Sequence, residues 1–159
     1  ILTRNTVEQL KYIHAVYDLA EENGDVADSS YEALEKRWKD GNAERGEKVK
    51  KGEVIYGLKE YTFQLYLDYE LSTLKEKYCN DTSREGMKLT EDEVLQHYQS
   101  RDWIFGDSEE NADRETARIA VERELREQKY DDMITQRENG SQVEGNMKDV
   151  NRYTLKNIQ

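Results

Sequence analysis

The chain contains no proline among its 159 residues. Proline breaks the interior of a helix, because its ring removes a hydrogen-bond donor and clashes with the preceding turn. The absence of proline therefore favours long helices. Hydrophobic residues make up 35% of the sequence and charged residues 37%, so little apolar material is available for a core. Eleven tyrosines and two tryptophans add large rings, and we expect one lean folded domain.

Apolar residues recur at helical spacing along most of the chain. The pattern predicts about five helices, over residues 3–23, from 29 until it fades at 41–46, 61–79, from 90 towards 103, and 111–138. Residues 52–58 alone look extended, and their flanking glycines indicate a connector rather than a sheet. The sequence therefore predicts an all-α fold, an irregular bundle of about five helices.

Two of the predicted helices carry apolar residues on more than one face. In the helix over 61–79, one face holds Phe63, Leu67, Leu71, Leu74 and Tyr78. Nearly opposite lie Tyr61, Leu65 and Tyr69, so this helix lies between two layers or leaves one face available. In the helix over 111–138 the apolar stripe changes face midway, which predicts two packing partners or a bend.

The charge of the chain excludes several classes of protein. A net charge of −11 argues against general nucleic-acid binding, which needs a basic surface to neutralise phosphates. No apolar run is long enough to span a bilayer. Residues 36–51 are locally basic within this acidic chain, with seven basic residues against three acidic ones. This stretch either faces the lipid headgroups of a membrane to which the protein is tethered, or is a solvated face that balances the acidic remainder.

Catalytic and metal-binding motifs are weak. Glu93 and His97 lie one helical turn apart and could ligate a metal, but no further ligand is tied to them, so a solvated surface pair is the better interpretation. The two Glu-x-x-His motifs of a di-iron bundle are not present, and no glycine-rich phosphate loop follows a strand. We therefore predict a protein that is not an enzyme and that needs no cofactor or metal.

Aromatic residues are more numerous than so polar a chain needs at its surface. They either form the core, since aliphatic residues are scarce, or line an amphipathic groove for extended or unfolded peptides. The candidate peptide-binding residues are Trp38, Tyr61, Leu65, Tyr66, Tyr69, Trp103 and Phe105. A high acidic charge around such a groove would keep the protein and its client soluble.

Two motifs resemble a known family. Leu89-Thr90-x-x-Glu93-Val94-x-x-x-Tyr98, which has the spacing of a capping box, resembles the end of the chaperone lobe in the SurA/PrsA-type parvulin foldases. The helix that returns after the isomerase domain in those proteins is similar to the last predicted helix, at Ile119, Leu125, Lys129, Tyr130, Asp131, Ile134 and Val143. The match covers about residues 55–143. Only ten residues separate Trp103 from Arg114, whereas an isomerase domain needs on the order of a hundred.

The resemblance implies a chaperone lobe without isomerase activity, whose long C-terminal helix packs back on the N-terminal helices. It implies a single domain over residues 1–143, with N-terminal helices in 1–55, a core lobe in 56–143 and a polar tail in 144–159. It also implies a bacterial protein exported to the cell envelope, with an upstream lipid anchor and proximity to the membrane. Its partners would be unfolded or extended polypeptides. The alternative is a helical adaptor or assembly subunit that uses the same face for one specific partner or for a homodimer.

Overall fold

A computed structural model describes residues 4–140 of the chain. Those residues form five helices and no strand: α1 Arg4–Glu22, α2 Tyr31–Lys50, α3 Phe63–Asn80, α4 Glu91–Gln99 and α5 Arg114–Gly140. The predicted all-α fold of about five helices is confirmed. None of the described helices combines the length and the apolar composition needed to cross a membrane. Val143 and the predicted polar tail over 144–159 lie outside the described residues.

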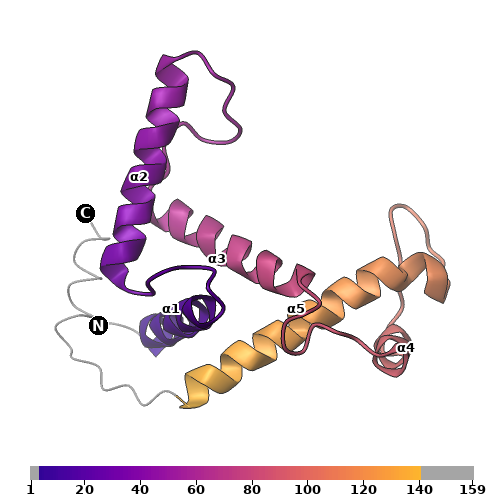
Figure 1. The fold of residues 1–159 in the computed structure, drawn as a ribbon. Helices are drawn as coiled ribbons and strands as arrows, with labels where there is room; N and C mark the ends of the chain where they lie inside the picture. The colour runs from indigo at the N-terminus through magenta and orange to yellow at the C-terminus, as the bar shows by residue number, and fades with distance from the viewer. Residues whose placement is uncertain (1–3, 141–159) are drawn as a thin grey trace.

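The helix α5 organises the fold. It packs against α1 and α3 near one end and against α4 near the other (Figure 1). The predicted packing of the long C-terminal helix on the N-terminal helices is therefore confirmed. The helix α2 packs mainly against α3, and Figure 1 shows its far end projecting away from the rest.

Two hydrophobic clusters hold the helices together, and α5 contributes to both. Its residues Tyr130 and Ile134 belong to the first cluster, with side chains from α1, α2 and α3. The second, smaller cluster lies between α4 and α5 and consists of Val94, Trp103, Ala117 and Val121. The change of apolar face predicted along this helix is thus confirmed, and it reflects two packing partners.

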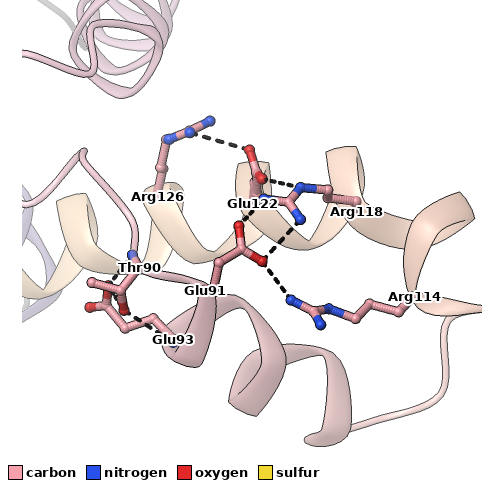
Figure 2. A network of polar contacts seen from close by, with 7 residues as sticks. All are labelled: Thr90, Glu91, Glu93, Arg114, Arg118, Glu122 and Arg126. Carbon is pink, nitrogen blue, oxygen red and sulfur yellow. Dashed lines mark hydrogen bonds and ion pairs between the residues drawn. The ribbon is translucent and has the colours of Figure 1, made fainter.

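The start of α4 is fixed by its own sequence. Thr90 Oγ1 accepts a hydrogen bond from the Glu93 main-chain N–H at 3.3 Å, and the Thr90 main-chain N–H donates to Glu93 Oε2 at 2.8 Å (Figure 2). This is the capping box expected from the sequence. The ammonium of Lys129, on α5, also contacts Glu93 and, together with the bonds from Thr90, lowers the pKa of that carboxyl to about 2.

Ion pairs then join α4 to the side of α5 (Figure 2). Glu91 accepts from Arg114 at 2.7 Å and from Arg118, whose Nε also donates to Glu122 at 2.9 Å. Arg126 donates to the second oxygen of Glu122 at 3.3 Å. Glu91 is exposed and its partners on α5 are half-buried, so water still screens each pair. Each pair therefore stabilises the fold only modestly, and the network mainly fixes how the short α4 lies on α5.

The helix α2 differs from the sequence prediction at both ends. The predicted helix opens at residue 29, whereas α2 begins at Tyr31 after the N-cap Ser30, whose Oγ accepts from the main-chain N–H of Ala33 at 3.2 Å. The helix also continues past Gly41 and Gly46, where the pattern was expected to fade, and ends at Lys50. A glycine costs a helix about 1 kcal/mol relative to alanine, and contacts made by the second half of α2 outweigh that cost.

A half-buried cluster of polar side chains joins the three N-terminal helices. Glu70, on α3, accepts from the hydroxyl of Tyr17 on α1 at 2.6 Å and from Arg37 Nε on α2 at 2.7 Å. Burial and the adjacent carboxylate raise the pKa of Tyr17, so this hydroxyl remains a donor. The group anchors the base of the projecting α2 to the body of the fold.

Candidate functional site

The second half of α2, the loop of residues 51–62 and the start of α3 form a projecting unit, here called the arm (Figure 1). Asn42 joins its two sides, because its amide donates to the Tyr61 carbonyl at 2.8 Å and its oxygen accepts from the Tyr61 N–H at 2.9 Å. The indole of Trp38 donates to the same carbonyl at 2.7 Å. Both polar groups of one loop residue are therefore held by side chains of α2.

Arg45 holds the middle of the loop. Its guanidinium donates to the carbonyl of Leu58 at 2.8 Å and to that of Tyr56, and lies 5.1 Å from the ring centroid of Tyr61. The turn at Gly57 has a φ of +80°, and a Cβ added there would lie 3.0 Å from the Tyr61 hydroxyl. The loop therefore has one specific conformation even though it contains no helix or strand.

Aromatic rings continue from the arm along the outer face of α3. The rings of Tyr61 and Tyr69 stack with centroids 5.9 Å apart, and Tyr66 lies 6.5 Å from Tyr69. Leu65 and Tyr69 are exposed, whereas Phe63 and Leu67 on the other face are buried. The two-faced helix expected from the sequence thus has one face in the core and one face available.

The remaining two candidate residues lie at the other end of the molecule, between α4 and α5. Trp103 is only 2% exposed, and its indole donates to the Tyr98 carbonyl at 3.0 Å. Phe105 is exposed beside it and helps to line a groove of about 270 Å³ against α5. The guanidinium carbon of Arg101 lies over the Trp103 ring, 3.9 Å from the ring centroid.

The structure therefore divides the seven predicted binding residues into two groups. Those on the arm and α3 are Trp38, Tyr61, Leu65, Tyr66 and Tyr69. Trp103 and Phe105 form the second group, and Trp103 belongs to a hydrophobic cluster. Their role in binding stays a prediction. Sequence reasoning missed Asn42 and Arg45, because single polar residues in a helix give no pattern that marks a clamp.

Glu93 and His97, the candidate metal ligands, face different partners. Glu93 is occupied by Thr90 and Lys129, as described above. His97 Nε2 lies 3.2 Å from Glu124 Oε1, and its ring contacts Trp103 edge-on. Within residues 4–140 no group of three side chains is arranged to hold a metal ion.

Comparison with known proteins identifies a relative in sequence. No protein-family model matches the chain. A chaperone for lacto-N-biosidase from Bifidobacterium longum subsp. longum is 32% identical over 136 residues. The match covers 86% of this chain and 49% of the relative, so the chain spans about half the length of that protein. That relative is named as a chaperone and not as an enzyme, which agrees with the prediction of a non-catalytic chain.

The fold is also present in solved structures. Two crystal structures of a GH136 lacto-N-biosidase from Eubacterium ramulus, the native protein and its selenomethionine derivative, match with TM-scores of 0.68 and 0.69. The sequence identities are 19% and 20%, and the matches cover 91% and 92% of this chain but 29% of that chain. This likeness establishes a shared helical fold.

The resemblance to the SurA/PrsA-type parvulin foldases was wrong. The sequence similarity extends over most of the chain to a chaperone for lacto-N-biosidase instead. The two motifs that carried the resemblance are a capping box and a set of apolar residues at helical spacing. Both features occur in helices of many unrelated folds. The envelope location, the lipid anchor and the membrane proximity rested on that resemblance and stay predictions, as does the homodimer.

Proposed function

We propose that the chain is a non-catalytic chaperone dedicated to one client, a glycoside hydrolase of the lacto-N-biosidase kind. The observation that carries this proposal is the 32% identity, over 86% of the chain, to the chaperone for lacto-N-biosidase of Bifidobacterium longum. The sequence analysis predicted unfolded or extended polypeptides in general as partners, and this proposal restricts them to one client protein. It also agrees with the second hypothesis, a helical subunit with one specific partner.

Features of the fold support this proposal. The arm and the outer face of α3 expose apolar and aromatic side chains that neither hydrophobic cluster uses. The loop on the arm is held in one conformation, which suits recognition of one partner better than capture of many sequences. A related fold makes up 29% of the Eubacterium ramulus lacto-N-biosidase chain, so a helical lobe of this kind accompanies the rest of that protein.

Co-production tests the proposal. A lacto-N-biosidase-like hydrolase from the organism that makes this chain is produced in three ways: alone, with this chain, and with an unrelated acidic helical protein. We expect this chain to raise soluble hydrolase activity roughly tenfold or more, because a partner that binds only folding-competent states shifts the equilibrium away from aggregation. The acidic control, with a pI near 4.8, should give no rise.

Equal soluble activity with and without the chain would contradict the proposal. A different result would replace it: if unrelated aggregation-prone enzymes gained as much soluble activity as the hydrolase, the chain would be a general holdase for extended polypeptides.

A further inference from the structure

The loop of residues 51–62 presents apolar side chains to solvent. Val54 is 80% exposed and Tyr56 is 87% exposed, and Leu58 is also exposed. They alternate along an extended segment, with the half-buried Ile55 between the first two. Large apolar groups gathered in this way mark surfaces that bind another molecule, since burying them removes apolar area from water.

The loop is already ordered without a partner. Arg45 and Asn42 hold its carbonyl and N–H groups, and Gly57, at a φ of +80°, makes the turn next to Tyr56. A segment that is fixed before binding loses little conformational freedom when it binds. The loop therefore behaves as a preformed projection, and it fits a surface that has a matching hollow.

The charge around the loop indicates which charge a partner surface should carry. The chain has a net charge of −11, yet residues 36–51, which belong to the adjoining α2 and its C-cap, carry a local charge of +4. The guanidinium of Arg45 donates to main-chain carbonyls, which are neutral. Its positive charge beside the loop is therefore not cancelled by these bonds. Lys51 and Lys59 lie on either side of the exposed apolar residues, and so do Glu53 and Glu60. All four are exposed, and the stretch over 36–62 as a whole keeps a net charge of +3, with eight basic and five acidic residues. A partner surface that carries carboxylates complements this end of the molecule and would be repelled by most of the rest.

We propose that residues 51–62 form a docking hook that inserts Tyr56 into an apolar pocket rimmed by carboxylates on the glycoside hydrolase client. This inference rests on the proposed function and names the surface that performs it. Tyr56 supplies the apolar area, Val54 and Leu58 flank it, and the basic residues of the arm meet the acidic rim. The aromatic outer face of α3 continues the contact surface from Tyr61 to Tyr69.

Substitutions on the hook test this assignment in the same co-production assay. A variant with both Val54→Ser and Tyr56→Ser should lose roughly tenfold or more of the soluble hydrolase activity, as expected for anchors at the centre of an interface. Ile119→Ser is the matched control, because Ile119 is 83% exposed on α5, away from the arm, and should leave the yield unchanged. Far-UV circular dichroism must show equal helix content for all variants.

Two further variants separate shape from charge. Gly57→Ala keeps all three apolar side chains but strains a residue at φ +80° beside Tyr61, and should also lower the yield. Lys51→Glu with Lys59→Glu should lower it, whereas Lys88→Glu, another exposed lysine distant in sequence, should not.

The outcomes distinguish the hook from the function. If the unchanged chain gives no rise in hydrolase activity, the proposed function fails. If the unchanged chain works and the Val54 and Tyr56 double variant works equally well, the hook is wrong. Loss of yield on replacing Phe105 by serine, with the hook variants fully active, would overturn the hook and place docking at the groove between α4 and α5.

Discussion

Replacing Trp103 by alanine is expected to lower the free energy of unfolding by about 3–5 kcal/mol, the range for removing a large buried aromatic side chain. The second hydrophobic cluster holds few other buried side chains, so this one ring supplies much of its apolar area. Its removal also leaves the Tyr98 carbonyl without the indole donor. The loss is a large share of the stability of a domain of this size. Urea denaturation followed by circular dichroism measures it.

Phe105 provides the control for this prediction, because it lies two residues away on the same loop but is exposed. Phe105→Ala should change the free energy of unfolding by less than about 1 kcal/mol. Similar losses for the two variants would mean that Trp103 is not part of a core. It would then be available for binding, as the sequence alone allowed.

Replacing Asp25 by alanine is expected to cost about 3 kcal/mol, because it removes the common partner of two cations. The Asp25 side chain is 4% exposed and accepts from Arg84 at 2.8 Å and from Lys77 at 2.7 Å. It joins the end of α1 to α3 and to the segment that follows α3. Arg84 is itself largely buried and would keep only Asp81 as an ion-pair partner among the described residues.

The exposed pair of Lys36 and Asp40 is the control for Asp25. Both of its side chains lie mostly in water, so Asp40→Ala should change the free energy of unfolding by about 0.5 kcal/mol or less. Equal effects of the two substitutions would show that Asp25 makes no special contribution.

The effect of Asp25→Ala should also depend on pH. The hydrogen bond from Arg84 holds the pKa of Asp25 below its usual value. A carboxyl whose pKa is lowered by folding stabilises the folded state above its unfolded pKa, near 4, and loses that contribution as the pH falls through the lower folded value. The difference in unfolding free energy between the unchanged chain and the variant should therefore be full at pH 7 and shrink below about pH 4.

Features that depend on a few neighbouring residues could be predicted from the sequence. The capping box at Thr90 needs only Thr90 and Glu93, and the structure has it. The change of face along α5 was visible because apolar residues set the helical period directly. The second half of α2 could not be predicted, since its two glycines weaken the helical pattern. Its helix is supported instead by contacts from Asn42 and Arg45 to a loop 11 to 19 residues away.

The candidate site was harder to predict than the fold. Composition marks aromatic residues as important but does not separate a ring in the core, such as Trp103, from one on the surface, such as Tyr69. The sequence also identified residues 52–58 as a connector without showing that its apolar side chains face solvent. That exposure follows from the way Arg45 fixes the loop, which only the three-dimensional arrangement reveals.

The most direct test of a dedicated chaperone is refolding in the absence of any other protein. The hydrolase is unfolded in urea and diluted with increasing amounts of this chain, or with an acidic protein of similar pI. The account predicts that recovered hydrolase activity rises with this chain and reaches a plateau near one chain per hydrolase, and that the acidic protein has no effect. Recovery that is the same with this chain, with the acidic protein and with buffer would contradict it.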